Sequence, residues 1–127
     1  MAKTALDITA EDMALYRATA QRLKQQEAQE LRLRLERARA VAQQAATLLR
    51  EQFGAKRVIL FGSVARGFIF HARSDIDLGV AGLSDQVFWR AWAALDSLGS
   101  EFEIDLVDLE TASSALLDQI KQEGLEL

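Results

Sequence analysis

The chain has 127 residues, which is enough for one domain with one modest hydrophobic core. It has no cysteine and a single histidine, His71, so disulfides, thiol catalysis and zinc sites built from cysteines or several histidines are excluded. The formal net charge of −4 argues against DNA as a partner, because nonspecific nucleic-acid binding needs a basic surface. Neither a signal peptide nor an apolar run of membrane-spanning length is present in this sequence, so we expect a cytoplasmic protein without membrane contact.

The first long segment, residues 10–53, is rich in strong helix formers and contains neither glycine nor proline. Thr9 and Asp12 resemble a capping box and Gly54 is a good residue to end a helix, so we predict a helix over 10–53. Its apolar residues form two stripes that are one residue out of phase. Either the helix breaks near residues 25–30, or one continuous helix presents two faces, which is the reading we favour. A continuous helix would be about 65 Å long, so part of it should project or meet a partner, and an oligomer could form through it.

After the helix, glycines separate short apolar runs and helical patterns. The predicted elements are a strand over 57–61, a helical turn over 63–67, a strand over 75–80, a helix over 85–98, a strand over 103–108, and a last helix from Thr111 or Ser113 to Gln122. This order predicts an α+β (mixed α/β) fold with a small mixed β-sheet flanked by helices. We divide the chain into an N-terminal helical extension over 1–44 and a second domain over 45–127.

Two aspartates open the second predicted strand. Side chains two residues apart in a strand point to the same side, so Asp75 and Asp77 should project together while Ile76 and Leu78 point into the core. Two such close carboxylates repel each other unless a cation lies between them. Because the chain lacks cysteine and has one histidine, carboxylates must bind any metal, which favours a hard ion such as Mg²⁺.

A third aspartate, Asp105, lies in the next predicted strand between two apolar residues, so it should also face away from the core. If the two strands are neighbours, Asp75, Asp77 and Asp105 converge. Three carboxylates can hold two metal ions, the arrangement used for in-line displacement at phosphorus. Asp108 is the fallback for the third position, although it should face the other side of a regular strand.

The turn between the first predicted strand and the helical turn supplies groups that can bind phosphate. Gly62 lets a phosphate approach the backbone closely, and backbone N–H groups at this turn are free to donate to it. The Ser63 hydroxyl can add one donor, and Arg66 can reach a phosphate with its forked guanidinium. We therefore predict that Gly62, Ser63 and Arg66 bind a nucleoside triphosphate.

Two motifs together resemble a known signature. Gly62-Ser-Val-Ala-Arg-Gly67 followed by Ser74-Asp-Ile-Asp-Leu78 is similar to the signature of the minimal nucleotidyltransferase (MNT) family within the DNA polymerase beta superfamily. Residues 104–107, where the family has its third carboxylate, and residues 120–124 also agree, and the resemblance covers roughly residues 45–127. It implies a polymerase-beta-like nucleotidyltransferase core, catalytic and metal-binding Asp75, Asp77 and Asp105, two Mg²⁺ ions, and ATP as the substrate from which AMP is transferred.

The same resemblance implies a partner. Members of this size are often paired with a helical HEPN-domain toxin, which they neutralise by attaching AMP to a tyrosine, by binding, or by both. We therefore expect a nucleotidyltransferase that is the antitoxin of a HEPN/MNT toxin–antitoxin pair and transfers AMP to a hydroxyl of its partner. A non-catalytic antitoxin that neutralises a helical partner by binding is the first alternative. A small-molecule nucleotidyltransferase of the aminoglycoside type is the second, and it would need a partner chain because this chain has no acceptor-binding domain.

Three regions differ from the family pattern or carry no predicted chemistry. The loop that contains Phe68, Ile69 and Phe70 is apolar where the family commonly has a polar, proline-containing loop, so we expect these residues to pack or to contact a partner. His71 is interpreted as a loop or contact residue, not a general base. The charged residues between Lys24 and Arg39 are most simply a solvated helix face.

Overall fold

The computed structural model describes residues 8–67, 75–99 and 101–127. The chain divides into two compact units, residues 1–33 and 34–127. The first long element, α1 (Ala10–Phe53), is one uninterrupted helix, so the prediction of a continuous helix is confirmed. The domain boundary that we place after residue 44 stays a prediction. Within the described residues, no helix combines the length and the apolar character that crossing a membrane requires.

The first unit contains the predicted helix start. The Thr9 N–H donates to Asp12 Oδ2 at 3.2 Å, and the Asp12 N–H donates to Thr9 Oγ1 at 3.1 Å, which confirms the capping box. Large apolar side chains on this part of α1 are exposed: Leu15 is 70% exposed, Tyr16 72% and Leu23 51%. The helical part of this unit therefore forms from local propensity and capping, with its apolar residues left at the surface.

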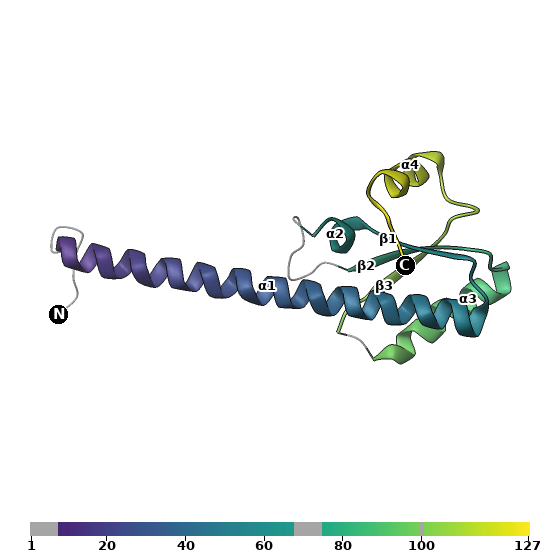
Figure 1. Ribbon diagram of the computed structural model, residues 1–127, viewed down its shortest axis with the longest axis horizontal. Coiled ribbons are helices and arrows are strands. Elements are labelled where there is room, and N and C mark those ends of the chain that lie inside the picture. Colours follow the sequence, from purple (N-terminus) through teal and green to yellow (C-terminus); the bar gives the residue numbers. More distant parts are fainter. Residues whose placement is uncertain (1–7, 68–74, 100) are drawn as a thin grey trace. The chain divides into compact units, whose positions relative to one another are not determined.

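The second unit is built on a four-stranded mixed sheet (Figure 1). The strand order is β3-β2-β1-β4, in which β1 is antiparallel to both neighbours and β2 is parallel to β3. The strands are β1 (Arg57–Phe61), β2 (Ile76–Ala81), β3 (Ile104–Asp108) and β4 (Leu125–Glu126). The helices are α2 (Gly62–Arg66), α3 (Asp85–Leu95), the 3-10 helix η2 (Asp96–Leu98) and α4 (Ser114–Glu123). The predicted small mixed sheet flanked by helices is confirmed.

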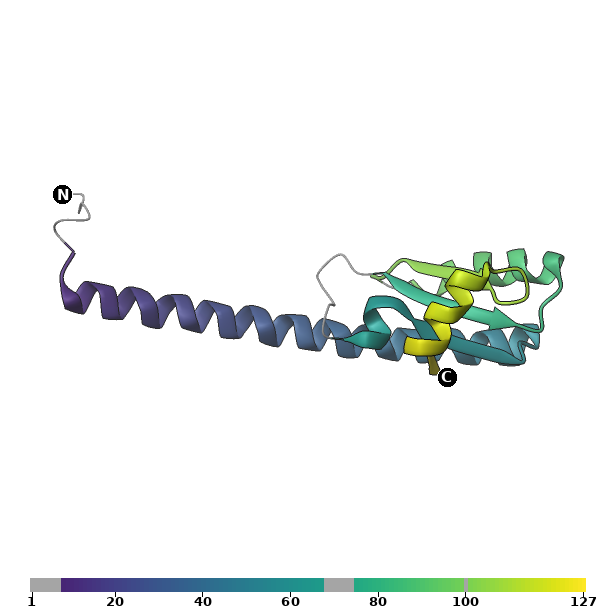
Figure 2. The same cartoon turned by 90° about the horizontal axis from the view of Figure 1, so that it is seen from above.

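Helices cover the two faces of this sheet unequally. The turns of α1 that follow Arg34 lie on the same face as α3, whereas α4 lies on the opposite face (Figures 1 and 2). Side chains along a strand alternate between the two faces of the sheet. Those that face α1 and α3 form the larger core. They are Val58, Leu60, Ile76, Leu78, Val80, Ile104 and Leu106, all at most 9% exposed. A smaller cluster under α4 contains Ile59, Phe61 and Ile120.

Two features of the C-terminal part differ from the prediction. The predicted helix over 85–98 ends as an α-helix at Leu95 and continues as the 3-10 helix η2. Strand β4 was missed, because two residues carry no alternation that could reveal a strand. It is held by pairing with β1, and the Leu127 N–H donates to the Val58 carbonyl at 2.9 Å. This pairing holds the segment that follows α4 against the edge of β1.

Replacing Ser113 by Ala should lower the free energy of unfolding by about 1 kcal/mol. Ser113 is the N-cap of α4, and its hydroxyl accepts a hydrogen bond from the Leu116 N–H at 3.2 Å. Ser114→Ala is the matched control, because Ser114 is an exposed first-turn residue with no capping role and alanine favours a helix. Urea denaturation of both variants measures the difference, and equal stabilities would contradict the capping role.

Candidate active site

The register of the sheet brings two of the predicted site residues side by side. Asp77 of β2 is the direct partner of Asp105 of β3, and Phe61 of β1 is the direct partner of Asp77. Because directly opposed residues project to the same side, both aspartates share the sheet face of Phe61, which α4 partly covers. Asp75 precedes the first residue of β2 and is also partly buried. The condition under which Asp105 joins the site, that the two aspartate-bearing strands are neighbours, is met.

Negative charge is crowded around Asp77. Its pKa is raised from 3.8 to about 6, with burial as the largest cause, followed by the charge of Asp105 and then that of Asp75. Arg66 acts in the opposite direction and lowers the pKa of Asp77. A carboxyl group whose ionisation is opposed by burial and by neighbouring negative charge marks a place where a bound cation would be favoured.

Replacing Asp77 by Asn should stabilise the metal-free protein at pH 7 and leave its stability at pH 4 nearly unchanged. A carboxyl group whose pKa rises on folding destabilises the folded state once it is ionised. This cost is absent below about pH 4, grows between about pH 4 and pH 6, and is complete above pH 6. Because Asp77 is only half-buried, we expect a gain of about 1–2 kcal/mol at pH 7. Urea denaturation in chelator at both pH values measures it, and an equal gain at both would contradict ionisation as the cause.

Mg²⁺ fits the donors at this edge of the sheet. Asp77 and Asp105 offer carboxylate oxygens, and the repulsion between their charges is what a divalent cation would relieve. Within the part of the chain that the structure describes, no three His, Cys, Asp or Glu side chains are gathered closely enough to hold one ion. Of the three predicted ligands, the structure sets Asp77 and Asp105 side by side. That these residues and Asp75 bind a metal stays a prediction.

Gly62 forms the turn from β1 into α2 directly against Asp77. Its φ angle is +76°, a conformation that residues with a side chain rarely adopt. A Cβ atom at this position would lie 2.3 Å from Asp77 Oδ2. Ser63 follows as the second residue of α2 and is partly buried. The turn that we predict to bind phosphate is therefore in contact with the carboxylate that we predict to bind metal.

Arg66, at the end of α2, faces Glu123, which lies in the segment 120–124 of the family resemblance but has no predicted role. Its Nη1 donates to Glu123 Oε2 of α4 at 2.5 Å, and Gln119 donates to the other oxygen of Glu123 at 2.8 Å. Burial alone would raise the pKa of Glu123. Hydrogen bonds from Arg66 and Gln119, together with the charge of Arg66 and the backbone of Gly62, lower this pKa below its ordinary value. Glu123 is thus an ionised carboxylate beside the predicted phosphate turn.

A second missed residue supports α2 from the other side. Arg39 of α1, which we expected on a solvated helix face, donates from Nε to the Val64 carbonyl at 3.1 Å and from Nη2 to the Ala65 carbonyl at 3.2 Å. These carbonyls belong to the short helix α2, whose last turn has few partners of its own. Arg39 is exposed, as we expect for this stretch, and its guanidinium also reaches across to the neighbouring backbone. The expectation of a solvated face is wrong at Arg34, whose side chain is only 22% exposed.

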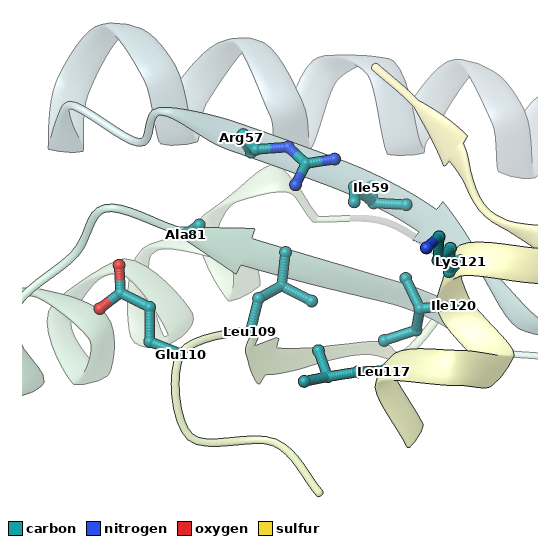
Figure 3. A pocket seen from close by; sticks show the side chains of 8 residues that line it. All are labelled: Arg57, Ile59, Ala81, Leu109, Glu110, Leu117, Ile120 and Lys121. Atoms are coloured by element: carbon teal, nitrogen blue, oxygen red, sulfur yellow. The ribbon is translucent and has the colours of Figure 1, made fainter. Parts of the chain in front are cut away.

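An apolar pocket of about 410 Å³ opens at the far end of the same sheet face (Figure 3). Arg57 and Ala81, which line it, pair with each other at the end of β1 and β2 that is remote from Phe61 and Asp77. Leu117 and Ile120 of α4 form its other wall. The pocket is therefore separate from the paired aspartates. The loop with Phe68, Ile69 and Phe70, together with His71 and Ser74, lies outside the described residues.

A mixed sheet that sets two aspartates side by side under a glycine-serine turn defines a nucleotidyltransferase of the polymerase beta type. Residues 43–127, more than half of the chain, match the family Polymerase beta, Nucleotidyltransferase, and the chain belongs to this family. A curated relative, the protein adenylyltransferase MntA of Shewanella oneidensis, is 35% identical in an 83-residue alignment that covers 63% of this chain. The chain spans 59% of the length of that relative.

Solved structures agree with this assignment. A toxin–antitoxin complex with AMP-PNP contains a chain that is 31% identical with a TM-score of 0.57, covering 67% of this chain and 70% of that one. A complex of the tri-AMPylated HEPN toxin of Shewanella oneidensis with its MNT antitoxin matches at 27% identity and a TM-score of 0.53, over 70% of each chain. A structure described as a minimal nucleotidyltransferase matches at 34% identity and 0.58, covering 73% of this chain and 95% of that one.

Proposed function

We propose that this protein transfers AMP from ATP to a hydroxyl group, preferably of a tyrosine, on a HEPN-type partner and so acts as the antitoxin of the pair. The observation that carries the proposal is the register that sets Asp77 beside Asp105 under the Gly62 turn. The relatives support it, since one is a protein adenylyltransferase and one solved complex contains an AMPylated HEPN toxin. Because ATP and a bacterial toxin of this kind meet in the cytoplasm, we place the reaction there.

Asp75, Asp77 and Asp105 are the residues that would hold Mg²⁺, as two ions. Bound there, the metal would neutralise charge that develops on the phosphate oxygens during transfer. Asp105 lies on the edge strand β3, where a partner's hydroxyl can approach it. It accepts the hydroxyl proton while the hydroxyl oxygen bonds to the α-phosphorus and the bond to pyrophosphate breaks. Asp77, more enclosed, stays with the nucleotide throughout.

Gly62, Ser63 and Arg66 are proposed to hold the triphosphate. Gly62 has no side chain between its backbone and the space above Asp77, and Ser63 adds a hydroxyl donor at the same turn. Arg66 adds a guanidinium whose Nε is buried without a hydrogen-bond partner among the described residues. This part of the chain acts by positioning the α-phosphorus and stabilising charge, which are the main contributions to such a transfer.

The proposal is tested by incubating the chain with its HEPN partner, Mg²⁺ and labelled ATP. Label on the α-phosphate should appear on the partner, and EDTA should abolish it. ATP labelled on the γ-phosphate is the control, because that label leaves with pyrophosphate. Transfer of the γ-label would indicate that the reaction is phosphoryl transfer and not nucleotidyl transfer. An unlabelled partner in both arms would refute the proposal.

Neutralisation by binding alone is the second candidate, and one observation favours it. Leu15, Tyr16 and Leu23 are exposed apolar side chains in the first unit, as expected of a surface that contacts another chain. The same residues could instead join two copies of this chain. Light scattering of the chain alone and with its partner, using wild type and Tyr16→Lys, tests both. Loss of the complex in the variant would support a partner contact, and loss of an oligomer would support self-association. No change would exclude Tyr16 from both contacts.

A further inference from the structure

The ion pair between Arg66 and Glu123 is the best-enclosed ion pair in the part of the chain that the structure describes. The side chains are 26% and 17% exposed, whereas the neighbouring pair of Arg57 and Glu126 is 56% and 57% exposed. Enclosed ion pairs are screened less by water than surface pairs, so they hold their partners more firmly. Nη1 of Arg66 is therefore firmly held by Glu123 in this structure.

The fold holds Glu123 in place from its C-terminal side. The next residue, Gly124, ends α4, and its N–H donates to the Ile120 carbonyl at 2.7 Å. A Cβ atom on Gly124 would lie 2.4 Å from that carbonyl oxygen and 2.6 Å from Cγ2 of Ile59. Pairing of β4 with β1 follows immediately. The end of α4 is thus packed tightly on β1, so only the side chain of Glu123 is free to leave Arg66.

Charge determines what the ion pair does to the site. Among the described residues, Arg66 is the one cation that lowers the pKa of Asp77, and Glu123 acts on the same group with the opposite sign. While the pair is closed, its charges nearly cancel and the positive contribution to the site is small. A triphosphate brings several negative charges and forms strong bidentate hydrogen bonds with a guanidinium. Glu123 occupies Nη1, and a phosphate group needs this donor as well for a bidentate contact, because the unpartnered Nε alone offers a single hydrogen bond.

We propose that Glu123 is an internal competitor that sets the triphosphate affinity of the site by occupying Arg66 until a phosphate displaces it. The inference rests on the proposed function, because it takes a nucleoside triphosphate to be the ligand. Binding breaks the hydrogen bond from Arg66 Nη1 to Glu123 and turns the guanidinium to the phosphate, while Gln119 retains the carboxylate. The contact stabilises the empty site and for the same reason lowers the affinity of the site for the nucleotide.

Glu123→Gln tests the proposal because it keeps the shape and removes the charge. Titration of the full chain in Mg²⁺ with ATP, and separately with inorganic tripolyphosphate, should show about tenfold tighter binding of both probes to the variant. Adenosine should not respond, since it has no phosphate. Glu126→Gln is the matched control, because it removes a carboxylate of the same C-terminal segment from the exposed pair with Arg57, and it should bind like wild type.

A second comparison separates competition from a general loosening of α4. In an Arg66→Gln background, Glu123→Gln should leave the affinity for tripolyphosphate unchanged, because the shared donor is gone. A variant that tightened binding equally in both backgrounds would act through its charge alone and would overturn the competition. Weaker or unchanged binding by Glu123→Gln would also overturn it, and weaker binding would make Glu123 a support for Arg66. If wild type and every variant bind neither probe, the proposed function itself fails.

Discussion

AMP transfer should fall by about a thousandfold when Asp77 is replaced by Asn, while the complex with the partner still forms. Asp77 is the most crowded carboxylate of the site, enclosed between Asp105 and the Gly62 turn. Asparagine has nearly the same shape but cannot supply the charge that holds a divalent cation. Initial rates of label transfer at saturating ATP measure the loss. Asp118→Asn, an exposed aspartate of α4, removes one charge elsewhere and should retain the wild-type rate.

The same variant decides between catalysis and binding as the biological activity. If this protein neutralises a toxin by AMP transfer, as proposed, cells that express the toxin with the Asp77→Asn chain should stop growing. If binding suffices, they should grow as they do with wild type although the toxin carries no label. A variant that transfers AMP at more than a tenth of the wild-type rate would contradict the role of Asp77 in either case.

Gly62→Ala should reduce AMP transfer by about a hundredfold, for a reason that differs from backbone strain. Gly62 has a φ angle of +76°, and its Cβ would be 2.3 Å from Asp77 Oδ2, so the carboxylate must move away from the turn. Gly54 has a φ angle of +75° with nothing within 4 Å of its Cβ position. Gly54→Ala therefore carries the same backbone cost, about 1 kcal/mol, without displacing a site residue.

The two glycine variants should have similar unfolding free energies and very different transfer rates. Chemical denaturation and label transfer on the same preparations measure both quantities. Equal activity of the two would show that the contact between Gly62 and Asp77 has no part in the reaction. A large loss with Gly54→Ala would show that strain in this unit is enough to disable the site.

Much of the local structure could be predicted because it depends on neighbouring residues. Thr9 and Asp12 form their capping box within one helical turn, and Ser113 caps α4 three residues from its donor. The alternation of Asp75-Ile-Asp-Leu78 likewise predicts which side chains are buried, and Ile76 and Leu78 are fully so. These patterns follow from the periods of helix and strand, which covalent geometry dictates.

What escaped prediction involves partners that are distant in the chain. Glu123 meets Arg66 across 57 positions, and Arg39 meets the α2 carbonyls across 25 and 26 positions. Strand β4 exists only because β1 offers it an edge. None of these contacts leaves a periodic trace, since any charged or polar residue at those positions would look the same in the sequence.

The amino-acid sequence by itself determined the order of the helices and strands, the turn at Gly62 and the side of β2 that Asp77 occupies. Only the tertiary structure decided that Asp77 lies opposite Asp105 and that Glu123 holds Arg66. The physical reason is that strand register and helix docking are chosen by the packing of the whole core, in which many distant apolar groups are buried together. Local geometry sets the direction of a side chain, and the packed core sets its neighbour.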